Sequence, residues 1–152
     1  MDTKRIEQLL TLIANTSKSQ ADYDDTSKLV MEILDYHDSI VSIDVNDVRD
    51  LFQEGGVIHA FNASVDASME NRMILMMAKI MKHAECFEPY NRALVFFFFP
   101  EKQPLLIEEL QPFSEWMESV PDEFMIKWGM ATQSTQELRA IVLLQSDQRA
   151  VL

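Results

Sequence analysis

Residues 93–99 read Ala-Leu-Val-Phe-Phe-Phe-Phe, an unbroken apolar run between Asn91-Arg92 and Pro100. The run is too short for an isolated buried helix, and it is rich in the aromatic residues that favour strands. A strand with no polar position has no face left for water, so we expect a central strand of a sheet that is covered on both sides. The segments before and after this strand must supply those covers.

Three amphipathic helices are predicted before the first strand. Apolar residues recur at helical spacing over residues 3–14 and again from Thr26 to Asp38, and a polar connector separates the two helices. The third helix begins near Asp44 and is expected to end at Gly55-Gly56, because glycine accepts the left-handed conformation that closes a helix.

The start of the third helix carries a specific local signal. Asp44 stands at the N-cap and Asp47 at the third helical position, and Ile43 is placed to contact Val48 as a hydrophobic staple. Carboxylates at these positions stabilise a helix through its free N–H groups and its dipole. Asp50 follows at the same spacing, so a helix brings the three carboxylates to one side, where they are able to bind a cation or orient water.

The segment after the third helix predicts a strand and a further helix. Residues 57–64 alternate between two faces, which is typical of a strand. Ser68 is then a candidate N-cap for a helix with one long apolar stripe, which we expect to be buried. The stripe consists of Met69, Met73, Met76, Met77, Ile80, Met81 and Ala84.

Beyond the central strand, a helix is predicted over residues 106–120, and Pro112 implies either a kink or a late start. Alternation in residues 124–131 and 137–145 predicts two last strands, which we expect to pair as a hairpin. The predicted fold is α+β: a four-stranded mixed sheet with packed helices in strand-helix-strand-helix-strand-strand order, preceded by N-terminal helices.

Composition narrows the function. The chain has 152 residues and a net charge of −12, which disfavours nucleic acid and anionic membranes as partners. A single cysteine and three scattered histidines give no metal motif, so we expect no metal and no other cofactor. The N-terminus has no signal-peptide pattern and no stretch is long and apolar enough to span a membrane, so we expect a cytoplasmic protein.

No catalytic constellation emerges from the motifs. No glycine-rich phosphate loop is present, and the adjacent glycines stand alone. Cys86 follows His83 by three residues, but a packed thiol at a helix end is the favoured interpretation. His59 on a predicted strand is interpreted as a satisfied interior imidazole. The sequence therefore favours a non-enzymatic role without settling the question.

Several segments resemble one family. Residues 42–49, Ser-Ile-Asp-Val-Asn-Asp-Val-Arg, are similar to the Asn-x-Asp-x-x-Asp-Val-Arg loop that opens the C-terminal domain of FtsZ, the bacterial relative of tubulin. Residues 68–72 resemble that domain's Ser-Gly-Glu-Asn/Asp-Arg helix start, and residues 93–95 its Gly-Val-Leu strand. Gly129 and the later residues 137–139 look like its terminal hairpin. The order and spacing agree across roughly residues 26–145.

The resemblance implies the fold of the FtsZ/tubulin C-terminal domain, without the GTPase domain. Residues 1–25 are then an N-terminal helix and connector, and residues 26–152 the module with its leading helix. In FtsZ the loop aspartates enter the nucleotide site of the next subunit and position the hydrolytic water. The candidate partner-loop residues that match this loop are Ser42, which replaces the usual Asn, Asp44, Asp47 and Arg49.

Two roles of this loop stay open: action on a neighbour's nucleotide, or helix capping alone. We expect a bacterial protein-interaction or scaffold module that self-associates as a homo-oligomer or binds an FtsZ-like, filament-forming partner. The alternative is a small-molecule-binding domain or an enzyme with a ligand pocket at an oligomer interface.

Overall fold

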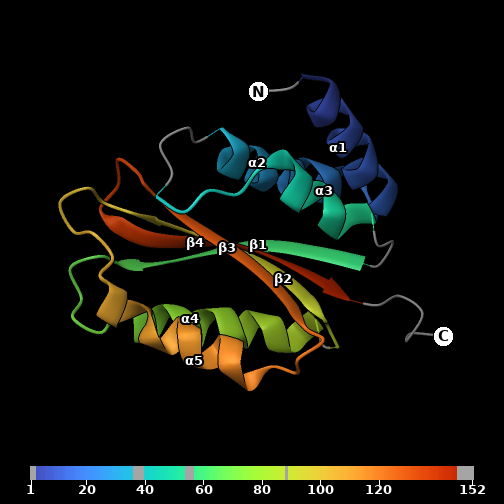
Figure 1. Ribbon diagram of the computed structural model, residues 1–152. Coiled ribbons are helices and arrows are strands. Elements are labelled where there is room, and N and C mark those ends of the chain that lie inside the picture. The colour runs from blue at the N-terminus through green and yellow to red at the C-terminus, as the bar shows by residue number, and fades with distance from the viewer. Residues whose placement is uncertain (1–2, 36–39, 54–56, 88, 147–152) are drawn as a thin grey trace.

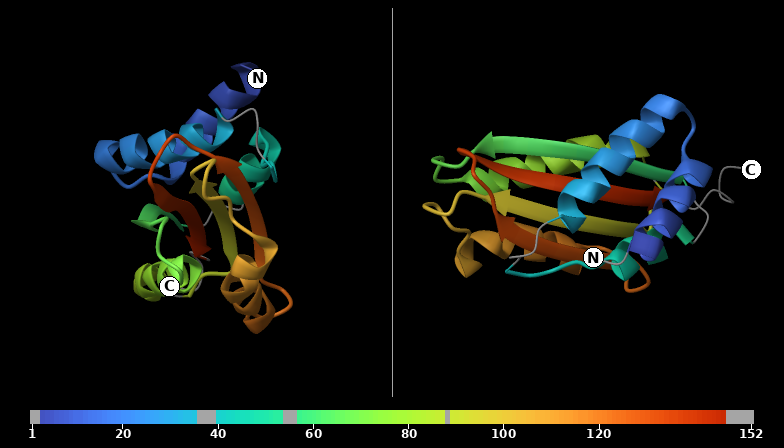
Figure 2. Two further views of the ribbon diagram at one scale, coloured as in Figure 1. Left: turned by 90° about the vertical axis from the view of Figure 1, so that its left-hand side faces the viewer. Right: turned by 90° about the horizontal axis from the view of Figure 1, so that it is seen from above.

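The computed structural model describes residues 3–35, 40–53, 57–87 and 89–146. Helices cover both faces of one four-stranded sheet, so the molecule has three layers (Figures 1 and 2). The layer drawn above the sheet in Figure 1 contains α1 to α3, and the layer below it contains α4 and α5. Among the described residues, no helix combines the length and the apolar character needed to cross a membrane.

The sheet order is β1-β4-β2-β3. β2 (Arg92–Phe99) runs parallel to β3 (Met125–Thr132), whereas β4 (Glu137–Ser146) is antiparallel to β2 and to β1 (Val57–Asp66). The two central strands are buried at nearly every position, and the two edge strands are only partly buried. The predicted central position of residues 93–99 is therefore confirmed, together with the mixed α+β class.

The predicted hairpin between the last two strands is wrong. In the sheet, β2 lies between β3 and β4. These last two strands are neighbours in sequence, but they do not pair with each other. An edge position for β2 would leave an aromatic strand with unpaired backbone groups exposed. Pairing β2 on both sides removes that edge, while β3, with its half-exposed side chains, takes the outer position.

The first helical layer consists of α1 (Thr3–Thr16), α2 (Gln20–Leu34) and α3 (Val45–Gln53). The prediction of a connector up to residue 25 is wrong, because α2 begins six residues earlier than Thr26, after the N-cap Ser19. The Ser19 side chain accepts a hydrogen bond from the Asp22 N–H. The expected boundary between residues 25 and 26 consequently falls inside α2. The predictions for residues 36–38 and for Gly55-Gly56 concern positions outside the described residues.

The second helical layer consists of α4 (Arg72–Ala84), the short 3-10 helices η1 (Glu85–Phe87) and η2 (Ile107–Leu110), and α5 (Gln111–Ser119). Ser68 does not cap α4: it donates to the Asp66 carboxylate in a turn, and Asn71 takes the N-cap position. Met69 therefore lies outside the helix and is exposed, whereas the later residues of its predicted stripe are buried or half-buried. Pro112 stands in the first turn of α5, so the late start is confirmed.

Alternation along the central strand divides the core into two halves. Phe97 and Phe99 face α4 and α5, whereas Phe96 and Phe98 face α1 to α3. Leu9 and Ile13 of α1 are completely buried in the second of these halves. The first helix thus folds back over the module within the same chain.

Candidate functional site

The predicted partner loop lies at the start of α3. The Asp44 carboxylate accepts hydrogen bonds from the Asn46 and Asp47 N–H groups, and the Asp47 carboxylate accepts one from the Asp44 N–H. These reciprocal bonds form a capping box. Ile43 and Val48 are both buried in the core half beneath α3. The predicted helix start is confirmed. Capping of α3 is sufficient to explain the presence of both Asp44 and Asp47 at these positions.

The remaining loop residues differ in exposure. Ser42 and Asp44 are exposed, whereas Asp47 and Arg49 are half-buried. The Arg49 Nε is shielded from water and has no hydrogen-bond partner within the described part of the chain. The loop therefore presents Ser42 and the outer edge of Asp44 to the surroundings, and the other two side chains lie against the body of the protein.

Lys127 is part of this site, and the sequence analysis missed it. Its Nζ lies 2.7 Å from Asp47 Oδ1, although the two residues are 80 positions apart. The hydrogen bond to Asp47 raises the pKa of Lys127, and the charges of Asp47, Asp50 and Asp44 act in the same direction. The ammonium group offsets part of the acidic charge that the loop concentrates. A pairing between a helix start and a distant edge strand leaves no local signal in the sequence.

Gly129 allows residues 40–41, which precede the partner loop, to lie close to the sheet. The Ile40 and Val41 N–H groups donate to the Met130 carbonyl, and the Met130 N–H donates to the Val41 carbonyl. A Cβ at Gly129 would lie 2.5 Å from the Val41 oxygen and 2.7 Å from the Phe96 ring. Only glycine leaves room for the chain to run along the edge of β3 and deliver residues 42–44 to the start of α3.

A small cavity of about 60 Å³ lies beside this loop. Its lining includes Asp47, Asp50, Arg92 and Lys127, two acidic and two basic side chains. Among the described residues, no group of three His, Cys, Asp or Glu side chains is arranged to hold a metal ion. The arrangement presents balanced charges at the protein surface, and this suits contact with another polar surface.

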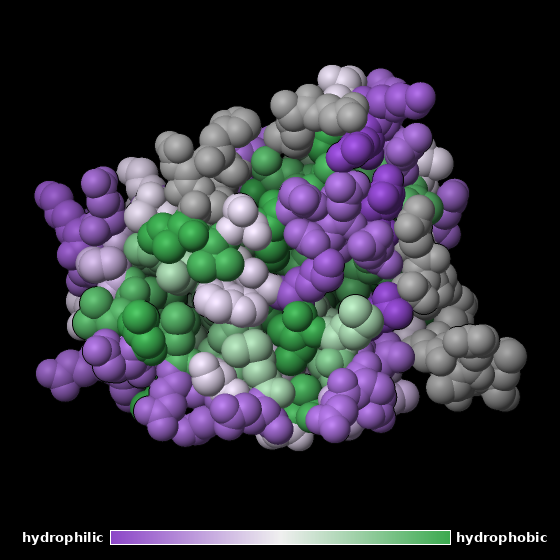
Figure 3. Space-filling view, in the orientation of Figure 1, coloured by the Kyte–Doolittle hydropathy of each residue, from purple (hydrophilic) through white to green (hydrophobic). Residues whose placement is uncertain are grey.

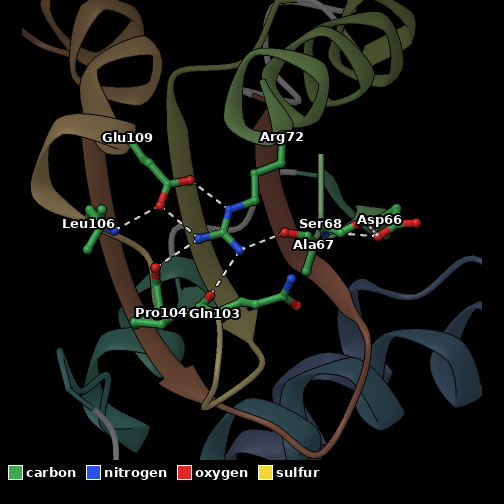
Figure 4. Close-up of polar contacts among 8 residues, drawn as sticks. All are labelled: Asp66, Ala67, Ser68, Arg72, Gln103, Pro104, Leu106 and Glu109. Atoms are coloured by element: carbon green, nitrogen blue, oxygen red, sulfur yellow. Dashed lines mark hydrogen bonds and ion pairs between the residues drawn. The ribbon is translucent and has the colours of Figure 1, made fainter. Parts of the chain in front are cut away.

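A second feature joins α4 to the segment before α5. Arg72, only 5% exposed, donates to both carboxylate oxygens of Glu109 at 2.6 and 2.7 Å. It also donates to the carbonyls of Ala67, Gln103 and Pro104 (Figure 4). The Glu109 carboxylate further accepts from the Leu106 N–H. Arg72 thus joins the Ser68–Arg72 motif to residues 103–109. The motif alone did not predict this role.

The sequence also offered Cys86, His83 and His59 as individual candidate residues. Cys86 is exposed, so the expected packed thiol is wrong. The His83 ring stacks on Phe61 and the His59 ring on Phe87, with centroids 4.8 and 4.0 Å apart. Burial lowers the pKa of His59, with a smaller contribution in the same direction from Lys18. These rings form a stack beside β1.

The fold is that of the FtsZ/tubulin C-terminal-like domain, and a comparison with solved structures supports this assignment. An empty FtsZ dimer from M. jannaschii matches 93% of the chain at 16% identity and a TM-score of 0.60. GDP-form protofilaments of TubZ from Bacillus thuringiensis serovar israelensis match 99% at 13% identity and a TM-score of 0.61. GDP-bound CetZ1 from Haloferax volcanii matches 84% at 15% identity and a TM-score of 0.51.

The match covers only part of each of these proteins. The chain spans 43% of the FtsZ chain, 42% of the TubZ chain and 40% of the CetZ1 chain. No protein-family model and no curated protein matches the sequence. The likeness at these identities concerns the fold, and it confirms the fold that the loop and helix-start motifs implied.

Proposed function

We propose that this chain is a non-enzymatic interaction or scaffold module of the FtsZ C-terminal type, which self-associates or binds a filament-forming partner. The observation that supports this proposal is a match of nearly the whole chain to two longer proteins. The match covers about two fifths of the length of each, and one was solved as a dimer and the other as protofilaments. We further propose that the module of residues 26–152 requires residues 1–25, because α2 spans the boundary between the two parts, and that it acts in a bacterial cytoplasm.

The loop at the start of α3 is the surface proposed for this contact. Ser42 and Asp44 are exposed there, although the same helix buries Val48, Leu51 and Phe52. The capping bonds and the Asp47–Lys127 pair hold the loop in one conformation without a partner. A preformed loop loses little conformational entropy on binding, and this favours contact with a neighbouring subunit.

Sedimentation velocity tests self-association, and co-pelleting with GTP-assembled FtsZ from M. jannaschii tests filament binding. We expect a sedimentation coefficient that rises over a roughly hundredfold increase in protein concentration, or co-pelleting that saturates. A chain that stays monomeric and also remains in the supernatant would contradict the proposal for this family of partners.

An Asp44→Asn variant separates the contact from the cap. Asparagine caps a helix about as well as aspartate, so stability should change by less than about 0.5 kcal/mol while the exposed charge is lost. We expect weaker association or co-pelleting in this variant. Glu101→Gln, an exposed charge change in the turn after β2, serves as the matched control and should leave association unchanged. Equal behaviour of both variants would remove the loop from the interface.

A further inference from the structure

We propose that the groove between α4 and α5 binds a short amphipathic helix of a partner protein, one that carries Lys or Arg beside its apolar face. This inference is independent of the filament contact, because the groove lies on the opposite face of the sheet from α3 (Figure 1). The groove has a volume of about 620 Å³. One wall comes from the start of α4 and the other from η2 and the start of α5.

Apolar side chains line part of this groove. Ile74, one of six large hydrophobic side chains that are exposed among the described residues, lines it together with Met73, Met77 and Pro112. Leu106 and Ile107, two more of the six, directly precede Glu108 of the second wall in the chain. Figure 3 views the molecule from the side on which α5 lies in front of α4, and it shows apolar side chains among hydrophilic ones over the left half of that face. Exposed apolar surface rimmed by polar groups is typical of a protein contact site.

The charge of the rim selects the partner. Four glutamates line the groove, and no Lys or Arg is among the described residues that line it. Glu109 is already paired with Arg72. Glu70, Glu108 and Glu115 are exposed, so they are available to a basic partner. A partner with Lys or Arg at its flanks gains attraction and specificity from these carboxylates, whereas an acidic partner is repelled.

The walls favour a helical occupant over an extended one. An extended peptide must find hydrogen bonds for its backbone, which it usually does by adding to a sheet edge. The walls here are helices and not a sheet edge, so they offer no row of unpaired donors and acceptors to an added strand. A helix satisfies its own backbone and inserts apolar residues spaced three and four apart into such a groove. Met73 and Met77, which line the groove, offer an adaptable apolar floor.

A second copy of this chain is a poor occupant. Each copy carries a net charge of −12, so two acidic surfaces would meet at the groove. The first helix, α1, also cannot supply the apolar face, because its Leu9 and Ile13 are completely buried in its own core. A basic helix from a different protein avoids both obstacles.

The network around Arg72 gives the groove a fixed shape. Arg72 joins the start of α4 to residues 103–109, and these are the segments that carry the two walls (Figure 4). The groove therefore exists before any partner arrives. A preformed groove costs less free energy to occupy than one that must open.

Fluorescence anisotropy with two labelled peptides of about five helical turns tests the proposal. Both peptides carry leucines at positions i, i+3, i+4 and i+7, flanked by Lys and Arg in one peptide and by Glu in the other. We expect the full chain to bind the basic peptide at least about tenfold more tightly than the acidic one. Binding of both peptides with equal affinity, or of neither, would overturn the proposal.

Two variants locate the binding. Ile74→Lys places a charge on an exposed groove residue and should weaken binding of the basic peptide at least about tenfold, as for an anchoring contact. Glu85→Lys makes a charge change outside the groove and should leave affinity within about twofold. Equal losses in both variants would mean attraction to the acidic surface in general and would overturn the groove assignment.

Thermal melting and sedimentation of the same variants complete the test. Ile74 is 60% exposed, so Ile74→Lys should melt like the wild type, and binding is read from a folded protein. A self-association that Ile74→Lys abolishes would identify a second copy as the occupant and would contradict the basic partner.

Discussion

At the scale of single residues, two positions lie in surroundings that no local sequence pattern predicts. Gly129 lies opposite Phe96 in the parallel pair of β2 and β3, and the backbone of Val41 passes directly over it. Gln145 is 2% exposed, and neither polar atom of its side chain has a hydrogen-bond partner among the residues that the structure describes.

We expect Gly129→Ala to lower the free energy of unfolding by about 1–3 kcal/mol or more, because the new methyl group overlaps a backbone oxygen and a buried ring. Urea denaturation measures the change. Met125→Ala, at an exposed position of the same strand, should cost less than about 1 kcal/mol. A Gly129→Ala variant as stable as the wild type would mean that the segment at Val41 moves aside freely.

We expect Gln145→Met to raise the free energy of unfolding by about 1–2 kcal/mol. The substitution removes an amide that is buried without partners and keeps a similar shape. Gln8→Met, at an exposed position of α1, is the control and should change stability by less than about 0.5 kcal/mol. Denaturation that shows Gln145→Met to be less stable would mean that the amide has a role in the folded state.

At the scale of elements, polar contacts determine where helices begin and which segments they join. Ser19 caps α2, which therefore begins before the predicted start at Thr26, and Asn71, not Ser68, stands before α4. All of these residue types cap helices well, so the local sequence offers several equivalent starts. Burial of Thr26 and the Arg72 network select among them.

The Arg72–Glu109 pair makes stability dependent on pH. The hydrogen bond from Arg72 lowers the pKa of Glu109 from its ordinary value of 4.5, although burial opposes this. A lowered pKa in the folded state means that the contribution is complete above the unfolded value and is lost as pH falls through the folded value. We therefore expect the free energy of unfolding to fall less steeply below pH 4.5 in Glu109→Gln than in the wild type.

Urea denaturation from neutral pH down to about pH 3 checks this slope. Arg72→Met is the companion variant: it removes the guanidinium donor from Glu109, which keeps only the Leu106 N–H, and from three carbonyl groups. It should cost about 3–5 kcal/mol at neutral pH. Parallel pH profiles for wild type and Glu109→Gln would show that the pair contributes no pH dependence.

At the scale of the whole molecule, two helical layers share one sheet, and α1 belongs to the structure as fully as the later helices do. Its apolar face packs on α2 and α3, above the half of the core that contains Phe96 and Phe98. The region before residue 26 therefore covers apolar surface that would otherwise face water. Measurements of stability test whether residues 26–152 fold without residues 1–25.

We expect Leu9→Ala and Ile13→Ala each to lower the free energy of unfolding by about 2–5 kcal/mol, since both side chains are completely buried. Gln8→Ala, an exposed neighbour on the same helix, should change it by less than about 0.5 kcal/mol. Small effects at both buried positions, measured by chemical denaturation, would mean that α1 is dispensable and that residues 26–152 fold alone.

The sequence by itself determined the elements with strong local patterns. The apolar run at 93–99 required a central strand, the spacing around Asp44 required a capped helix, and the order of elements required a mixed sheet with helices. Burial periodicity and capping act over a few residues, so a single sequence displays them directly.

Only the tertiary structure decided which strands are neighbours and which distant charges meet. β2 separates β3 from β4, Lys127 reaches Asp47, and Arg72 reaches Glu109. Strand order depends on the burial of the whole sheet, and ion pairs between elements depend on how the layers pack. Both are properties of the assembled molecule, because the free energy that selects them comes from contacts between residues far apart in the chain.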